Sequence, residues 1–274
     1  MGHPQTWDWK IAGYLFLAGA GSGAFLVAAA GNLGLPLTRT AALLGVCLVG
    51  VGAILLIGDL GNKLRFWRVL SNPTSSWISI GSWLIGLFLL SGTLYFFSPN
   101  ATLAWVGMLA AAGTATYTGI LLGVVKARPF WNTPLLPILF LVSALSTGTA
   151  LITLLAAWMA LPTVPWFGQY AWRLIILEGL LVFLYLLVMV QSTAMAARSA
   201  REVLWGSLKA WFWGGTVGAG LVLPLTIFVL GFSGAWLVIA AWLVLAGGAS
   251  LRWWMLRAGA RRPLPGEGWE DLLI

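Results

Sequence analysis

Two carboxylic acids in this sequence fall inside or at the edge of long apolar runs. Asp59 ends one such run, and Glu178 lies about one and a half turns into another. A charged carboxylate costs a few kcal/mol in hydrocarbon, so an acid at such a position is a candidate for function. Asp59 could simply pair with Lys63 or Arg65. Glu178 could likewise form a salt bridge with Arg173, or it could carry protons in a polar cavity.

Two of the five tyrosines occur near the same end of their apolar runs. Tyr14 opens the first run, close enough to its end for an ordinary interfacial position. Tyr117 lies near the end of the fourth run among Thr114, Thr116 and Thr118, which make one turn of that run polar. A phenol away from the membrane interface usually needs a hydrogen-bond partner. Both tyrosines are therefore candidates for ligand binding.

The composition excludes several classes of protein. Of the 274 residues 60% are hydrophobic and 8% are charged, and the mean hydropathy is +0.95, which indicates a protein dissolved in a membrane. Cys47 is the only cysteine and His3 the only histidine, so we expect no disulfide, iron–sulfur cluster, paired-histidine haem or other metal in this chain. The net charge of +8 comes from residues between the apolar runs, which form no nucleic-acid groove.

Eight apolar runs are each long enough to cross a bilayer as a helix. Backbone in lipid must satisfy its own hydrogen bonds, and these runs are too long for barrel strands. The sequence therefore predicts an all-α integral membrane protein with eight transmembrane helices. The runs cover residues 12–35, 40–60, 77–97, 102–125, 134–160, 172–196, 208–231 and 233–255.

An even number of spans places both termini on one side of the membrane. We call this side face X; it also carries the loops 61–76, 126–133 and 197–207, and the opposite side is face Y. Face Y receives only Arg39 and Arg173 of the 15 basic residues. Because basic loops stay in the cytoplasm, we predict a multi-pass protein of the inner (cytoplasmic) membrane with face X and both termini cytoplasmic.

The candidate side chains gather under face X, where the first run begins and the second and fourth runs end. An apolar pocket with a few donors and acids there suits a lipophilic, proton-exchanging ligand such as a quinone. Tyr14 and Tyr117 would hold the quinone carbonyls, and Asp59 would exchange protons. The residues expected to converge on this pocket are Tyr14, Asp59, Arg65, Tyr117, Lys126 and Arg128.

Small residues recur in the first and fifth runs, as Ser22-Gly23-Ala24 and Thr147-Gly148-Thr149. They permit close contact between helices, and their similarity hints that the first four and last four helices are parallel repeats. Packing alone also explains small residues in membrane helices.

Two longer motifs lie at residues 7–19, WDWKIAGYLFLAG, and at residues 117–119 with 126–137. The first resembles the opening of the NrfD family, the membrane subunits of polysulfide reductases, formate-dependent nitrite reductases and related complexes, and the second resembles that family's second signature. Further matches are residues 58–60, 65–67, 76–82 and 140–143, with Glu178 and Arg252 as looser ones.

The resemblance implies a haem-free subunit of two four-helix bundles, a quinone-bearing one at 1–125 and a second at 126–255, followed by a tail at 256–274. Such a subunit exchanges electrons between menaquinol or ubiquinol and a ferredoxin-like iron–sulfur subunit, which usually serves a molybdopterin catalytic subunit. In family members the quinone contacts match Tyr14 and Tyr117, although some carry histidine in place of Tyr14. The quinone head lies near the face that meets the iron–sulfur subunit.

Partner docking is expected on the basic loops of face X, at Lys63, Arg68, Lys126 and Arg128. Well-known members of the family dock their partners outside the cytoplasm and carry their basic loops on the opposite face, whereas the basic residues here lie on the docking face. Either the partner is cytoplasmic, which we favour, or an acidic partner neutralises these loops.

Two other functions fit the sequence less well. In a transporter or proton-translocating subunit, Glu178 and Asp59 would be stations of a path, yet no continuous polar chain joins them in the sequence. A passive membrane anchor would need neither a buried acid nor the polar turn around Tyr117.

Overall fold

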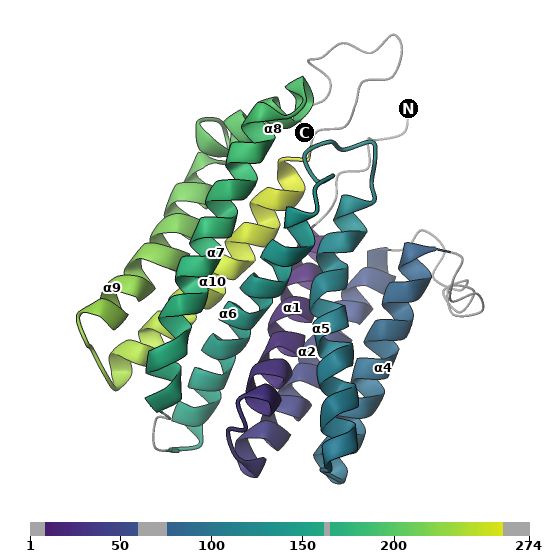
Figure 1. The fold of residues 1–274 in the computed structure, drawn as a ribbon, viewed down its shortest axis with the longest axis vertical. Coiled ribbons are helices and arrows are strands. Elements are labelled where there is room, and N and C mark those ends of the chain that lie inside the picture. Colours follow the sequence, from purple (N-terminus) through teal and green to yellow (C-terminus); the bar gives the residue numbers. More distant parts are fainter. Residues whose placement is uncertain (1–8, 60–75, 162–164, 260–274) are drawn as a thin grey trace.

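The computed structural model describes residues 9–59, 76–161 and 165–259. Every regular element in this part of the chain is a helix (Figure 1). Eight of these segments are long and apolar enough to cross a membrane. The predicted all-α fold with eight spans is therefore confirmed. The helices are α1 (Trp9–Ala30), α2 (Leu35–Asp59), α4 (Trp77–Phe97), α5 (Ala101–Gly123), α6 (Leu135–Trp158), α7 (Pro165–Gln191), α8 (Ala194–Leu204), η2 (Ala210–Val222), α9 (Leu223–Val229) and α10 (Ala235–Arg257).

The seventh span is built from two helices of different geometry. It begins as the π-helix η2 and continues as the α-helix α9, with Pro224 in the first turn of α9. Before it, the chain forms α8, which has one buried and one polar face and follows an N-cap at Thr193. The expected span at 208–231 is present, but the sequence predicted neither the π-helical turns nor α8.

The helices pack as two neighbouring rings that are in contact with each other. In the first, α1, α2, α4 and α5 each contact two of the others, and in the second α6, α7, η2 with α9, and α10 do the same. Helix α1 also packs against α6 and α10, so it lies in the interior of the protein (Figure 1). These contacts support the predicted division into two bundles, which stays a prediction.

The contact between α1 and α6 depends on glycines that let the two backbones touch. A Cβ atom on Gly23 would overlap the backbone carbonyl of Ala144, and a Cβ atom on Gly148 would overlap the backbone of Gly23. Small residues are the usual means of close helix approach in membranes. The small-residue motifs of the sequence therefore lie at the seam between the rings.

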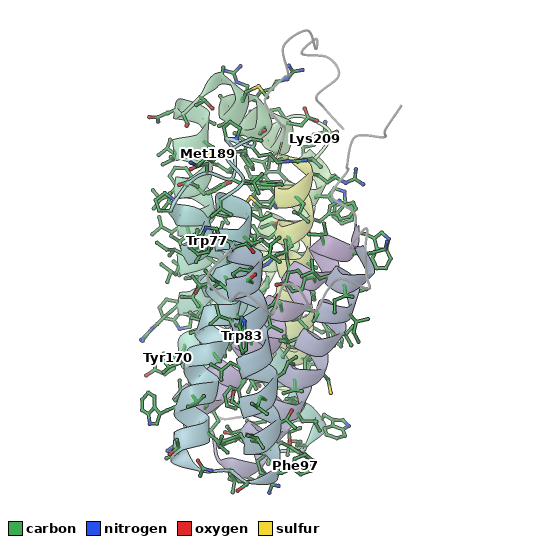
Figure 2. All side chains as sticks on the ribbon, turned by 90° about the vertical axis from the view of Figure 1, so that its right-hand side faces the viewer. Trp77, Trp83, Phe97, Tyr170, Met189 and Lys209 are labelled. Atoms are coloured by element: carbon green, nitrogen blue, oxygen red, sulfur yellow. The ribbon has the colours of Figure 1, made fainter. Side chains whose placement is uncertain are left out.

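Apolar side chains cover the outside of the helices, as expected for a surface in contact with lipid. Leu109, Phe183 and Trp83 are 71%, 62% and 51% exposed. Figure 2 shows such side chains along the outer surface, with Lys209 near the upper end and Phe97 at the lower end. The end at which α1 begins and α10 ends corresponds to face X, and the lower end to face Y (Figure 1).

Candidate functional site

Tyr14 and Tyr117 lie at the same depth inside the first ring. Tyr14 is five residues from the start of α1 and Tyr117 is six residues from the end of α5, so a rise of about 1.5 Å per residue puts both about 8 Å below face X. Tyr14 is fully buried and Tyr117 is 3% exposed. The two phenols are close enough to interact electrostatically. The structure thus brings together the two tyrosines that the sequence singled out.

Gly81 makes room for the Tyr117 phenol, and Gly52 lies against the Tyr14 ring. A Cβ atom on Gly81 of α4 would overlap the ring and hydroxyl of Tyr117. A Cβ atom on Gly52 of α2 would lie 3.4 Å from Cδ2 of Tyr14. Within the part of the chain that the structure describes, the Tyr14 hydroxyl is buried and has no hydrogen-bond partner. An unpartnered buried hydroxyl is costly, so this position suits a ligand that offers a hydrogen-bond acceptor or donor.

The threonines around Tyr117 use their hydroxyl protons within their own helix. Thr114 donates to the carbonyl of Ala110 at 2.9 Å and Thr118 donates to that of Ala115 at 2.7 Å. Thr116 does the same with Ala112 at 2.8 Å. Their oxygens can still accept a hydrogen bond, but Tyr117 is the side chain of this turn whose donor is directed away from α5, toward Gly81.

The structure describes only part of the segment that contains Asp59 and the basic residues after it. Asp59 is the last residue of α2, at the end of the first ring where α1 begins, and its side chain lies outside the described part. Lys63, Arg65 and Arg68 fall in residues 60–75, which also lie outside it. Their predicted roles in proton exchange and docking therefore remain predictions.

The second signature segment anchors the loop after α5 to α10. Arg128 donates a hydrogen bond to the carbonyl of Gly259, and its guanidinium lies 4.7 Å from the ring centre of Trp131. Trp131 is fully buried and donates from Nε1 to the carbonyl of Met255 at 2.8 Å. Arg128 thus contacts the end of α10, in the second ring.

The same loop contacts α7 through Phe130. The Tyr185 hydroxyl donates to the Phe130 carbonyl at 2.5 Å, and the aromatic side chains of these two residues meet edge to face with their centres 5.3 Å apart. Lys126 is exposed at face X, where a partner can reach it. The motif that the sequence linked to quinone binding therefore also clamps the two rings of helices together at face X.

Glu178 belongs to a buried network in the second ring. Its carboxyl lies beside Ser143 of α6 and is close enough to Arg252 of α10 to interact with it electrostatically. Arg252 donates to Ser143 Oγ, and its guanidinium lies 4.7 Å from the ring centre of Phe140. Glu178 is 5% exposed and Arg252 is 1% exposed, so this acid and this base are buried in the same part of the second ring, away from lipid and water.

The partner of Glu178 differs from the one that sequence proximity suggested. Arg173 lies over the rings of Tyr170 and Trp172, at 5.2 and 5.3 Å from their centres, whereas Glu178 faces Arg252. The sequence places Arg252 at face X with the other basic residues, but it is buried inside the protein. A single basic residue within the last apolar run was the signal that could have identified it.

A line of hydroxyls continues from this network along α6 toward face Y. Ser146 lies beside the Glu178 carboxyl without hydrogen-bond geometry, and Thr149 and Thr153 follow on the same side of α6. These three residues line a cavity of about 20 Å³ inside the second ring, bounded by Phe228 and Ala240 among others. Apart from these hydroxyls the lining is mostly apolar, and a cavity of this size has room for one water molecule.

Comparison with known proteins identifies the family. The protein matches the family described as "Polysulphide reductase, NrfD" over residues 1–101 and 96–263. It is 32% identical to the C component of the polysulfide reductase of Wolinella succinogenes, over 93% of this protein and 94% of that one. It is 28% identical to protein NrfD of Escherichia coli, over 93% and 95%, and 25% identical to the C component of the selenate reductase of Mesobacillus selenatarsenatis, over 65% and 55%. Because the match spans almost its whole length, this protein belongs to the NrfD family.

Proposed function

We propose that this protein is the quinone-binding membrane subunit of a respiratory oxidoreductase complex. It exchanges electrons between menaquinone or ubiquinone and a ferredoxin-like iron–sulfur subunit, which serves a molybdopterin-type catalytic subunit. Two relatives are named as components of a reductase, which supports membership of such a complex. The observation that carries the proposal is the buried phenol pair Tyr14 and Tyr117, one hydroxyl of which has no partner among the described residues.

The residues of this protein would bind and orient the quinol and accept its protons. Tyr14 and Tyr117 would hydrogen-bond to the ligand's two oxygens, and the apolar walls of the first ring would accept its tail. A quinol supplies electrons together with protons, so a proton acceptor is needed nearby; Asp59 ends α2 at the same end of the ring. The electrons would leave to a metal centre of a partner subunit at face X.

The partner would dock on the basic loops of face X. Lys126 is exposed there, and the predicted residues Lys63 and Arg68 follow α2 on the same side. The excess of basic residues at this face favours a cytoplasmic position for the loops, the termini and the partner in an inner-membrane protein.

Removing the Tyr117 hydroxyl is expected to lower quinone-linked turnover of the purified complex by about 100-fold, because a hydrogen-bond donor to the reacting oxygen is lost. Turnover of Tyr117→Phe is measured with a quinol donor, beside the rate with an artificial electron donor that bypasses the membrane subunit. Only the quinol-linked rate should fall.

Tyr95→Phe is the matched control. Tyr95 is a buried tyrosine of α4 near face Y, with its ring 5.5 Å from that of Phe25, and its change should leave both rates intact. Equal quinol-linked rates in Tyr117→Phe and Tyr95→Phe would remove Tyr117 from the site and leave the proposal without its main support.

A second activity, proton translocation, is favoured by one observation: the hydroxyls that lead from face Y to Glu178. Ser146, which lies beside the Glu178 carboxyl, lines this cavity together with Thr149 and Thr153. A water molecule in this cavity could pass protons between Glu178 and face Y. This polar line in the second ring, which the sequence did not reveal, supports the activity.

This activity predicts that electron transfer and proton movement can be separated. In vesicles that contain the complex, Glu178→Gln is expected to retain quinol-linked turnover, while proton movement beyond the protons that quinol oxidation itself releases falls to background. Thr93→Val, on an exposed hydroxyl of α4 that donates to Leu89, should change neither. Unaltered proton movement in Glu178→Gln would exclude Glu178 from any proton path.

A further inference from the structure

An apolar groove opens on the membrane-facing side of the seam between the two rings, toward face Y. It has a volume of about 320 Å³ and lies between α1, α6 and α7. Its walls are mostly leucine and small residues, and they include neither the tyrosine pair nor Glu178. Among the residues that line it are Leu26, Ala30, Leu145, Thr149, Arg173 and Leu177.

The groove has one charged residue, and this residue lies at its mouth. Arg173 shares the groove with Ala30 and Gly31, where α1 ends at face Y. From there Leu177 lies four residues, or about 6 Å, further along α7 toward the membrane interior. The groove therefore runs from the membrane interface, with a cation, into the hydrocarbon layer, without one.

Aromatic rings keep the Arg173 guanidinium at this level. Tyr170 and Trp172 are 40% and 37% exposed and lie within 5.3 Å of it, measured from Cζ to the ring centres. Figure 2 shows Tyr170 on the outer surface of the protein. Tyrosine and tryptophan of this kind mark the depth of lipid headgroups. The guanidinium is thus positioned where the phosphate of a membrane lipid lies.

We propose that this groove binds an anionic phospholipid, with an acyl tail between α1, α6 and α7 and the phosphate held by Arg173. The chemistry matches at both ends: a planar guanidinium binds phosphate oxygens in pairs, and an apolar channel accepts an alkyl tail. The lipid would fill the seam, where the two rings leave the α1–α6 contact exposed to the bilayer. A quinone offers no anionic group for Arg173, so the charge favours the phospholipid.

The test is binding of dioleoylphosphatidylglycerol to the full-length protein, purified in mild detergent with any accompanying subunits and measured by native mass spectrometry. Arg173→Gln is expected to weaken binding about five- to tenfold. Arg39→Gln is the matched control, because Arg39 is the other basic residue of face Y and donates to the Phe96 carbonyl at 2.9 Å. That variant should bind the lipid as the unaltered protein does.

A second variant tests the apolar part of the site with Arg173 intact. Ala30 is exposed in the groove, so Ala30→Trp fills its mouth and should also weaken lipid binding. Thermal unfolding in detergent verifies that each variant is folded. Undiminished binding in both variants overturns the proposal. The proposal is also overturned if Ala30→Trp loses a bound quinone that the unaltered protein carries, and no phospholipid. Equal competition by inorganic phosphate overturns it too, because it would indicate a simple anion site.

Discussion

Replacing Gly148 with valine is expected to destabilise the folded protein by about 3 kcal/mol or more, because the added side chain must enter the backbone of α1. A Cβ atom on Gly148 already overlaps the backbone of Gly23, and backbone atoms have no rotamer into which they could move aside. The helices α1 and α6 would have to separate, and with them the two rings. The measurement is thermal unfolding in detergent, together with the yield of monodisperse protein.

Gly86→Val is the matched control for this prediction. Gly86 lies within the transmembrane helix α4, and no described atom lies within 4 Å of a Cβ atom built there. The same substitution should therefore change the unfolding temperature little. Equal unfolding temperatures of Gly148→Val and Gly86→Val would show that α1 and α6 are not in close backbone contact at Gly148.

The number of spans could be predicted from the sequence because it follows from hydrophobic length. The run at 77–97 coincides with α4 (Trp77–Phe97), whereas the run at 172–196 extends past the end of α7 at Gln191. The π-helical geometry of η2 could not be predicted, since it accompanies contacts with another helix, α10. Gly220 and Gly247 meet backbone to backbone, and Ser250 Oγ donates to the carbonyl of Trp211 at 2.7 Å. Such contacts between helices leave no local pattern in a uniformly apolar run.

The order and direction of the spans predict one part of the candidate site, the pair of tyrosines. Tyr14 and Tyr117 lie at equal depth because α1 begins and α5 ends at the same face, and the order of the spans gives that. The partner of Glu178 depends instead on which way α7 is rotated about its axis. All sides of α7 are apolar in sequence, so the nearby Arg173 and the distant Arg252 could not be distinguished without the structure.

Removing the charge of Arg252 is the second change with a large expected effect. Arg252→Met should destabilise the protein by about 3 to 5 kcal/mol, because it leaves the buried Glu178 carboxyl without its cation. Arg257→Met is the control, since Arg257 is the exposed last residue of α10 and lies over Trp253. Thermal unfolding in detergent should show a clear loss for Arg252→Met and almost none for Arg257→Met.

A double variant separates the charge from the packing of the long arginine side chain. Glu178→Gln with Arg252→Met removes both charges, so it should recover much of the stability lost in Arg252→Met. If the double variant is as unstable as Arg252→Met, the guanidinium acts through its contacts with Phe140 and Ser143 rather than through Glu178. Recovery would instead mean that the loss in Arg252→Met comes from the Glu178 carboxyl left without its cation. A buried acid whose charge depends on one partner is a candidate for proton handling.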